Sequence, residues 1–550
     1  MKTRAQSLEI ASTREFDVVV IGGGIAGAGV AQDAAARGLS VLLVEKDDYA
    51  SGTSSRTTKL IHGGLRYLEQ FQFKLTRELC QERSVLEHLA PQLVRDFSFI
   101  MPLPRDNPLF GLKASLGLTV YDLLSFSVSG VHRHRRLSHR EVLEAAPALS
   151  NNAFGGGLRF HDCITDDSRM VVEVIKSACS LGAIAINYLE VRGFESEAGK
   201  ITAIQCHDRY NGVGMTIRCR ACVNATGVWS DEVCKLIDQS WRSHVAPSKG
   251  IHIIVPPSAF ETNTALFLPT ADKRYVFVVP WQRALMIGTT DRAYSGPLDK
   301  PLPDLDEIDY LLAVINSFTE TNRLNRSDIV GSFAGLRPLV QHTNFSGSTS
   351  DMPREHVIFD GPGGIIGLTG GKLTNYRLMA DQVVNRVVAR LPGAEPRRAN
   401  TKRIMLGGWM DKQDFLAATA AISAKARRLS IEPATLDHLT SSYGKDAQTI
   451  VDIVEQDASL NQRICPDFPP IMAEVPFCVI HEMAVSLEDL LMRRIRLGIL
   501  HQRQCLEAAP KVAELMQVLL KWDDVRTDAE LGVLERTLRE HMDLINAPVS

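Results

Sequence analysis

The stretch FDVVVIGGGIAG at residues 16–27 decides the fold of the N-terminal part of the chain. Its first half is an apolar, β-branched run suited to a buried parallel strand, and its second half places Gly22, Gly24 and Gly27 in a G-x-G-x-x-G pattern. A helical stretch and a second apolar strand follow, and Glu45 closes that strand. In such a βαβ unit the helix N-terminus binds the pyrophosphate of a dinucleotide, and the acid hydrogen-bonds a ribose. We therefore predict that these three glycines and Glu45 contact a dinucleotide.

Three later segments indicate which dinucleotide binds. A loop of small and hydroxyl residues, 51–67, follows the second strand and can wrap a pyrophosphate. NATG at 224–227 ends another apparent strand, and GGK at 370–372 opens a helix whose N-terminal amides suit negative charge on a reduced flavin. A nicotinamide enzyme needs none of these turns, so the pattern favours FAD. The further predicted FAD contacts are Thr53, Ser54, Ser55, Lys59, Ala225, Gly227, Gly370, Gly371, Lys372, Leu373 and Thr374.

Length and composition bound the architecture. A chain of 550 residues is too long for one compact core, so two or three domains are expected. Lys and Arg total 61 against 64 Asp and Glu, a formal charge of −3, which argues against a nucleic-acid-binding protein. No segment reaches the ~18 uninterrupted apolar residues of a membrane-spanning helix, and residues 1–15 lack an apolar signal core. We therefore expect an intracellular protein.

Cysteines and possible metal ligands give no sign of a metal site. Cys219 and Cys222 have CxxC spacing, but no second pair completes a zinc site. Both lie in an expected strand, 215–224, where positions three apart face opposite sides, so we expect them to be structural. No cluster of His, Asp or Glu has metal-ligand spacing, and a flavin needs none.

The remaining chain predicts a second domain inserted into the first and a helical C-terminal region. Residues 91–150 and 240–330 mix apolar runs with proline and turn residues. The strands expected there lie at 245–255, 275–279 and 284–288. A helix is expected at 374–391 after a glycine-rich return, and beyond residue 396 the pattern is helical, with Ser486 and Asp489 in capping-box positions.

Six blocks resemble the signatures of the FAD-dependent glycerol-3-phosphate dehydrogenases and occur in that family's order. They are IGGGIAGAGVAQDAAARG (21–38), TSSRTTKLIHGGLRYLE (53–69), KGIH (249–252), GTTD (288–291), GLRPL (335–339) and GGKLTNYR (370–377). The resemblance implies an α/β chain: a Rossmann-like FAD-binding domain of the D-amino-acid-oxidase type, an antiparallel-sheet substrate cap and an α-helical C-terminal domain. The expected ranges are 15–90, 151–240 and 325–395 for the FAD-binding domain, 91–150 and 241–324 for the cap, and 400–550 for the helical domain.

The resemblance also implies a substrate with a phosphate and a secondary alcohol, glycerol 3-phosphate. It brings Arg66, Arg337 and Lys372 to one pocket, where their cations suit phosphate oxygens. Tyr67 adds a hydroxyl donor there, and Thr289 is expected to orient the substrate or the flavin.

Oxidising the alcohol requires a base for the hydroxyl proton, and a histidine near neutral pKa is the natural one. His62 and His252 are the two candidates. The resemblance favours His62 as the base, His252 as the group that polarises the hydroxyl, and Arg337 as a further catalytic side chain. The residues alone leave open which histidine does which.

The electron acceptor implied by the resemblance is a quinone, which predicts a cytoplasmic protein held peripherally on the inner face of the cell membrane. An apolar stretch at 108–126, interrupted by Lys113 and Asp122, precedes a basic run at 132–136 and then His139 and Arg140. Such a pair fits the interface of an anionic membrane. In the alternative interpretation the apolar stretch is the cap's own core. An oxidase that reduces oxygen and a flavin-binding protein without turnover are the alternative functions, and the oligomeric state is open, a homodimer included.

Overall fold

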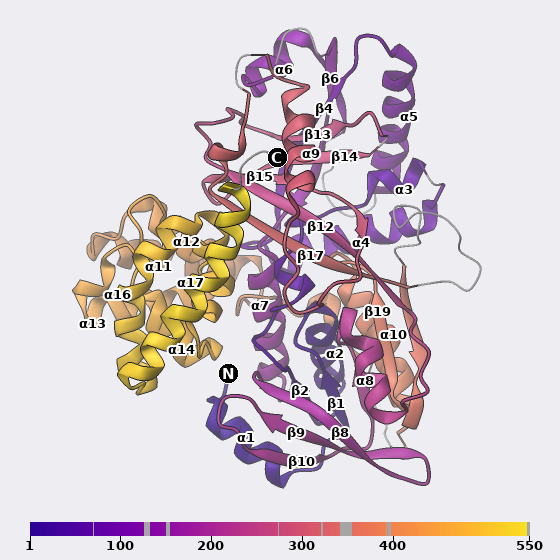
Figure 1. Cartoon of the computed structure of the whole chain (residues 1–550), viewed down its shortest axis with the longest axis vertical. Helices are drawn as coiled ribbons and strands as arrows, with labels where there is room; N and C mark the ends of the chain where they lie inside the picture. Colours follow the sequence, from indigo (N-terminus) through magenta and orange to yellow (C-terminus); the bar gives the residue numbers. More distant parts are fainter. Residues whose placement is uncertain are drawn as a thin grey trace.

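The structure is a computed structural model that describes residues 1–69, 71–125, 133–149, 154–272, 274–320, 323–340, 355–391, 393 and 398–546, and the side chains of Arg66, Glu69 and Asn546 lie outside this description. Figure 1 shows three parts. A part built on a parallel sheet occupies the lower half, a second sheet forms the cap above it, and a helical part lies on the left. The predicted fold class, α/β with a second sheet and a C-terminal helical domain, is confirmed.

The lower part contains a six-stranded sheet in the order β18-β19-β11-β1-β2-β7, parallel except for β18. The strands are β1 (Val18–Ile21), β2 (Val41–Val44), β7 (Ile184–Ile186), β11 (Cys222–Asn224), β18 (His356–Asp360) and β19 (Ile366–Gly370). Val18 and Val20 pack beneath helices α2 (Ile25–Ala36), α7 (Asp167–Ser180) and α10 (Tyr376–Val388), whereas Val19 and Ile21 pack into the core on the opposite face. Because both faces of β1 are buried, its sequence is apolar without alternation.

That opposite face is covered by a small antiparallel sheet and two helices. They are β8 (Leu189–Glu197), β9 (Lys200–Asp208), β10 (Gly214–Arg218), α1 (Arg4–Thr13) and α8 (Ser230–Ile237). The single strand expected at 215–224 is wrong, because β10 and β11 belong to different sheets and the chain changes sheet between them. Cys219 and Cys222 both pack into this core, and all ten cysteines are free thiols.

The cap is a ten-stranded sheet whose strand pairs are antiparallel except for the pair of β4 with β13. The strands are β3 (Leu60–Ile61), β4 (Arg95–Leu103), β5 (Arg135–Ser138), β6 (Gly156–Ile164), β12 (Val245–Val255), β13 (Ala265–Pro269), β14 (Tyr275–Trp281), β15 (Ala284–Gly288), β16 (Arg292–Ala293) and β17 (Gly331–Val340). The strands β6 and β17 pair with β4 and β12, although their residues fall in ranges expected for the FAD-binding domain. The two sheets are therefore interleaved along the chain more than the sequence indicates.

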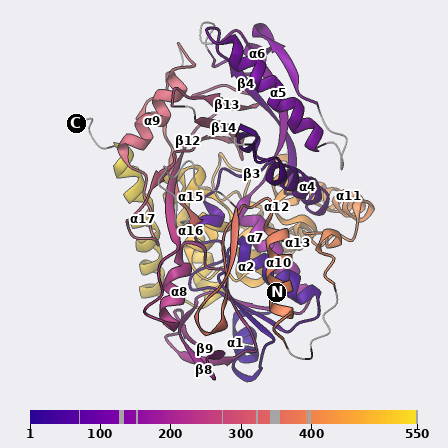
Figure 2. The ribbon, with the colours of Figure 1, turned by 90° about the vertical axis from the view of Figure 1, so that its right-hand side faces the viewer.

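Five helices border the cap sheet. They are α3 (Leu65–Glu69), α4 (Phe73–Leu89), α5 (Pro108–Ser125), α6 (His139–Ala145) and α9 (Leu305–Asn316). The helices α6 and α9 pack on one face of the sheet, while α3 and α4 both contact α5. Figure 2 shows α4 and α5 on the flank opposite α9 and the C-terminal helix α17. Among the described residues, no helix combines the length and apolar character needed to cross a membrane.

The C-terminal part is helical, as predicted. Its helices are α11 (Lys412–Arg428), α12 (Pro433–Tyr443), α13 (Ala447–Gln456), α14 (Glu474–Glu482), α15 (Leu497–Leu500), α16 (Gln502–Leu520) and α17 (Asp524–Asn546). Ser486 and Asp489 exchange reciprocal capping hydrogen bonds, as expected, but the turn that follows, Asp489–Arg494, is a π-helix. Short 3₁₀ turns lie at Thr53–Ser55, Gly227–Trp229, Arg326–Asp328, Pro362–Gly364, Thr401–Arg403, Gly444–Asp446 and Ala458–Asn461.

Three buried ion pairs join the helical part to the parallel-sheet part. They are Arg169–Glu482 at 2.6 Å, Arg494–Asp48 at 2.7 Å and Arg496–Asp167 at 2.9 Å, with every side chain at most 1% exposed. Charges buried this deeply are tolerated only when they are paired. The helical part is therefore bound to the rest of the molecule by charge as well as by apolar packing.

Candidate active site

Two cavities meet where the parallel sheet faces the cap. The first, of about 510 Å³, follows the glycine turn after β1, and we call it the glycine-turn cavity. The second, of about 270 Å³, lies between that turn and the cap sheet, and we call it the cap cavity. Their shared wall consists of Thr53, Thr57, Pro338, Gly370, Gly371, Lys372 and Leu373. A group in one cavity can therefore contact a group in the other.

The glycine-turn cavity has the form of a dinucleotide cradle. Gly22 and Gly24 line it at the N-terminus of α2, where the Ile25 amide donates to Ser54 Oγ at 3.0 Å. A Cβ atom on Gly27 would lie 1.9 Å from the carbonyl oxygen of Gly22, so the close turn needs glycine there. This backbone arrangement fits the pyrophosphate of FAD.

Glu45 lines the same cavity, at the end of β2. Its carboxylate accepts the amide hydrogens of Gly23 at 2.6 Å and Asp47 at 3.0 Å. Burial, reinforced by the neighbouring Asp47 carboxylate, raises the pKa of Glu45 to about 7. The carboxyl is thus placed beside the turn, where the predicted ribose contact requires it.

Most of the other predicted FAD residues also line this cavity, and four do not. Those that do are Thr53, Ser54, Ala225, Gly227, Gly370, Gly371, Lys372 and Leu373. Gly27 packs against the Gly22 carbonyl within the turn, Ser55 donates to the Gly52 carbonyl of its own loop, and Thr374 lines the cap cavity. Lys59 points into the protein interior, where its Nζ donates to Asp167 at 2.7 Å and to the Ser55 carbonyl at 2.8 Å. Burial lowers its pKa to about 8.

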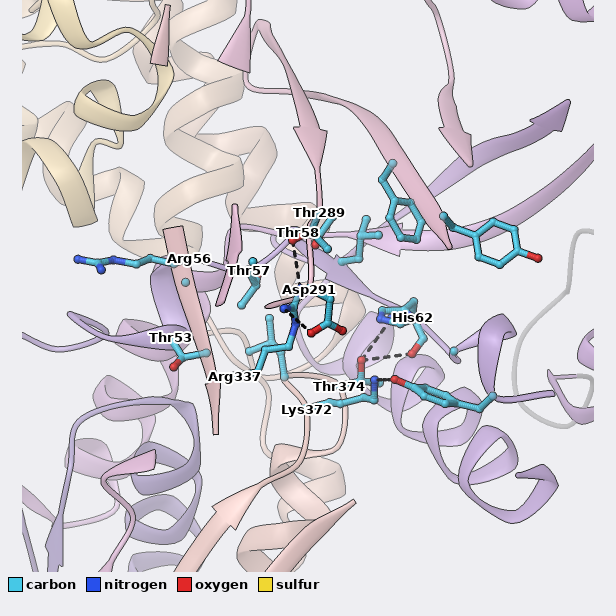
Figure 3. Close-up of a pocket in the computed structure, with 18 of the residues that line it drawn as sticks. Thr53, Arg56, Thr57, Thr58, His62, Thr289, Asp291, Arg337, Lys372 and Thr374 are labelled. Carbon is cyan, nitrogen blue, oxygen red and sulfur yellow. Dashed lines mark hydrogen bonds and ion pairs between the residues drawn. The ribbon is translucent and has the colours of Figure 1, made fainter. Parts of the chain in front are cut away.

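The cap cavity has a cationic end. Arg337 on β17 donates through Nη2 to Thr289 Oγ1 and to the Thr290 carbonyl, both at 3.1 Å, and lies 3.7 Å from the Asp291 carboxylate. A Cβ atom on Gly250 would come within 2.4 Å of this guanidinium, so the glycine leaves room for it. Figure 3 shows Arg337 and Asp291 at the centre of the cavity.

Lys372 and Tyr67 both line the cap cavity and contact each other. The Nζ atom of Lys372 donates to the Tyr67 hydroxyl and lies 4.1 Å from the centre of its ring. In Figure 3, Lys372, Thr374 and His62 are grouped on one side of the cavity, while Arg56 points away on the other. The structure thus brings together Arg337, Lys372 and Tyr67, as predicted, and the side chain of Arg66 lies outside the described residues.

Both candidate histidines line the cap cavity, in different environments. His62 follows β3, and its backbone amide and carbonyl are hydrogen-bonded to Thr374 Oγ1 at 3.2 and 3.3 Å. His252 on β12 contacts Thr58 Oγ1 through Nε2 at 3.0 Å and stacks on Phe333 with ring centres 4.8 Å apart. Burial, with the nearby cations of Lys59 and Arg337, holds the pKa of His252 well below its ordinary value. His252 is therefore neutral near pH 7.

Several lining residues were not anticipated from sequence. Arg274 reaches the cavity while paired with Asp272, and its guanidinium lies 4.9 Å over the Tyr310 ring. Asp291 stands within the quoted GTTD block, but nothing in that block marks it as a partner of Arg337. An aromatic wall completes the cavity and consists of Phe99, Phe160, Phe267, Tyr275 and Phe277. Aromatic residues alternate along β4 and β14, which was the available signal for those two strands, whereas β6 and β13 contribute one phenylalanine each.

Comparison with known proteins identifies the class. A family described as "FAD dependent oxidoreductase" matches residues 17–377, and one described as "C-terminal domain of alpha-glycerophosphate oxidase" matches residues 399–527. The first match covers more than half of the chain. Among solved structures, the glycerol-3-phosphate dehydrogenase from Bacillus halodurans complexed with FAD aligns over 100% of this chain and 99% of its own, with a TM-score of 0.82 and 28% identity. The protein is an FAD-dependent oxidoreductase, and its cofactor is FAD.

Sequence relatives narrow the class further. Glycerol-3-phosphate dehydrogenase 2 of Mycobacterium tuberculosis (strain ATCC 25618 / H37Rv) is 35% identical over 96% of this chain and 89% of its own length. Glycerol-3-phosphate dehydrogenase of Synechocystis sp. is 35% identical over 94% of this chain and 95% of its own. The chain belongs to the family of FAD-dependent glycerol-3-phosphate dehydrogenases.

Proposed function

We propose that this protein oxidises sn-glycerol 3-phosphate to dihydroxyacetone phosphate and passes the electrons to a quinone at a membrane surface. The observation that carries the first half is the wall shared by the two cavities. It lets a substrate bound near Arg337 and Lys372 reach the flavin end of the glycine-turn cavity.

Recognition of the phosphate is assigned to the cationic end of the cap cavity. The Arg337 guanidinium is held by Thr289 and the Thr290 carbonyl, so its planar fork is oriented before substrate arrives. Lys372, in the wall shared by the two cavities, adds a point charge, and Tyr67 adds a hydroxyl. Charge-assisted hydrogen bonds of this kind are worth about 1.5–3 kcal/mol each.

Removal of the hydroxyl proton is assigned to His62. Its backbone is fixed by Thr374, which places the imidazole beside the shared wall. His252 stays neutral near pH 7, so it can hydrogen-bond the substrate hydroxyl without competing with Arg337 and Lys372 for the phosphate. When bound, FAD would supply the two-electron acceptor for the hydride at C2. The chain's own share of this oxidation is the hydroxyl proton, which His62 takes from the substrate oxygen.

Anaerobic titration tests this assignment. Glycerol 3-phosphate added to the purified protein should bleach the flavin absorbance, whereas a flavin-binding protein without turnover would keep its colour. His62→Gln should slow flavin reduction, followed by stopped flow, about 10²–10⁴-fold with little change in substrate affinity. A normal reduction rate would transfer the role of base away from His62.

The membrane half of the proposal rests on helix α5, whose outer side carries exposed leucines. Leu109, Leu112, Leu116 and Leu123 are 65–76% exposed and recur at helical spacing, so they form one stripe. Leu118 and Tyr121 on the inner side are buried, which means that only part of the stretch belongs to the cap's core. The helices α3 and α4 contact α5, and the segment between them carries the exposed Phe71 and Phe73.

Exposed arginines follow α5 in the chain. They are Arg133, Arg135, Arg136 and Arg140, of which Arg135 pairs with Glu141 and Arg140 with Glu144. His134 contacts Asp122 of α5 at 2.7 Å, which ties this basic segment to the helix, and His132 lies outside the described residues. Each cation near an anionic surface contributes about 1 kcal/mol, so the segment complements such a membrane although the chain's net charge is −3.

Co-sedimentation with anionic liposomes tests the surface. A Leu112→Gln, Leu116→Gln, Leu123→Gln variant should lose binding, and Arg133, Arg135 and Arg136 changed to Glu should lose it at low salt. Leu416→Gln on α11, a leucine 57% exposed in the helical part, is the matched control and should bind normally. Turnover should reduce a soluble quinone analogue. Rapid oxygen consumption with stoichiometric peroxide and no quinone reduction would instead establish an oxidase.

A further inference from the structure

A buried polar cluster lies directly beneath the turn that carries His62. The Gly63 amide donates to the Tyr121 hydroxyl at 2.8 Å. Tyr121 in turn donates to the Asp162 carboxylate at 2.7 Å, and Arg83 donates to the same carboxylate at 2.6 Å. Each of these three side chains comes from a different element of the cap: Arg83 from α4, Tyr121 from α5 and Asp162 from β6.

This cluster is closed and leaves little freedom. The Tyr121 hydroxyl uses its one donor on Asp162, and it accepts from Gly63 and, at 3.3 Å, from Arg83. A Cβ atom on Gly63 would lie 2.5 Å from the Tyr121 oxygen, so glycine is required for this approach. Burial and the adjacent Asp162 carboxylate raise the pKa of Tyr121 well above its ordinary value, so the hydroxyl remains a donor.

Tyr121 also supports the element that follows the His62 turn. Its side chain packs in a small apolar cluster with Leu68 of α3 and Cys80 of α4. The α3 helix carries Tyr67, the proposed phosphate contact. One side chain of α5 thus contacts both the backbone next to the base and the helix that bears a substrate ligand.

We propose that Tyr121 is a positioning residue for the reaction: its hydroxyl accepts the Gly63 amide hydrogen and so fixes the turn that presents His62 to the substrate. The inference rests on the proposed role of His62 as the base. Thr374 holds His62 from the parallel-sheet side, and Tyr121 holds the next residue from the cap side. The turn is therefore clamped between the two sheets, and Tyr121, which does not line the cap cavity, acts through the backbone alone.

Tyr121→Phe tests this role because it removes only the hydroxyl and keeps the ring. The rate of flavin reduction at saturating glycerol 3-phosphate should fall about 10-fold, since the Gly63 amide loses its main acceptor. Substrate affinity and FAD content should change less than about 2-fold. Thr119→Val on the exposed side of α5, where the hydroxyl bonds only to the Ser115 carbonyl of its own helix, is the matched control and should leave the rate unchanged.

A double-mutant cycle separates positioning from a general loss of structure. In a His62→Gln background, Tyr121→Phe should cause no further fall in the reduction rate, because the residue that it positions is gone. An equal fall in both backgrounds would overturn the inference while leaving the base in place. If His62→Gln alone reduces normally, the proposed base fails, and a slow Tyr121→Phe then acts by another route, which overturns the inference as well.

Asp162→Asn gives a second variant should Tyr121→Phe fold poorly. The amide keeps an acceptor for the Tyr121 hydroxyl but loses the charge that binds Arg83 and that accepts, at 3.3 Å, from the Gly63 amide; Asp162 also lines the cap cavity, so substrate affinity is measured as well. Reduction should slow about 3-fold, again only when His62 is present. An unchanged rate in Asp162→Asn, together with an unchanged rate in Tyr121→Phe, would refute the clamp.

Discussion

Replacement of Arg337 by alanine should remove recognition of the substrate's phosphate and little else. The guanidinium is already oriented by two 3.1 Å hydrogen bonds to the Thr289 and Thr290 region, so substrate binding requires little reordering of the side chain. Loss of one charge-assisted contact, about 1.5–3 kcal/mol, corresponds to a fall in kcat/KM of roughly 10- to 150-fold for glycerol 3-phosphate. Arg337→Lys keeps the charge but not the fork and should fall between wild type and alanine.

Steady-state assays with two substrates and a control variant measure this effect. Glycerol, which has no phosphate, should be equally poor with wild type and Arg337→Ala. Arg292→Ala removes the same charge from the same sheet, but Arg292 is 46% exposed and paired with Asp306, so its kcat/KM should stay within about 2-fold of wild type. Equal losses on glycerol and glycerol 3-phosphate would refute the phosphate role, as would an Arg292→Ala loss as large as that of Arg337→Ala.

Three further outcomes concern the cofactor and the buried charges. Gly27→Ala should purify without flavin absorbance, with its fold checked by circular dichroism, because the added Cβ would lie 1.9 Å from the Gly22 carbonyl oxygen. FAD affinity measured by fluorescence should fall about 10-fold from pH 8 to pH 6, because the Glu45 carboxyl, with a pKa of about 7, loses the charge that accepts ribose hydroxyls; Glu45→Gln should show a flat profile. Burial raises the pKa of Glu482, but the Arg169 guanidinium outweighs this and holds that pKa at about 2, below the ordinary 4.5. The ionised Glu482 therefore stabilises the folded state above pH ~4.5, and this stabilisation is lost as pH falls toward 2. Tm should therefore fall more steeply between pH 6 and 3 in wild type than in Glu482→Gln, and parallel curves would contradict this.

The sequence predicted best those helices and strands whose ends are marked by residues within or next to the same segment. The strands β12 and β15 begin and end at the predicted residues, and their C-terminal ends are marked in the sequence by Pro256 and Gly288. Helix α2 begins at Ile25, inside the G-x-G-x-x-G turn, whereas the sequence predicts a helix only after that turn. The strand order could not be predicted, since the residues of β6 and β17 do not encode which sheet they join.

The candidate site likewise contains residues that the sequence predicted and residues that it did not. Motif residues such as Arg337 and His62 could be predicted because they stand in contiguous blocks, and both line the cap cavity. Lys59 was predicted as a cofactor contact, but it is buried against Asp167, 108 residues away in sequence. Tyr121, 58 residues from Gly63, was missed for the same reason. A buried polar side chain takes its role from a distant partner, and no local pattern records that partner.

The ion pairs between the helical part and the sheets determine which residues must change before the helical part can be removed. Removal of the helical part would take Glu482 from Arg169 and Arg496 from Asp167, but Arg169 would keep Glu173 and Asp167 would keep Lys59. Asp48 would lose both of its cations, Arg493 and Arg494. Removing one partner of a buried pair is destabilising, so an engineered truncation first needs a neutral residue at position 48.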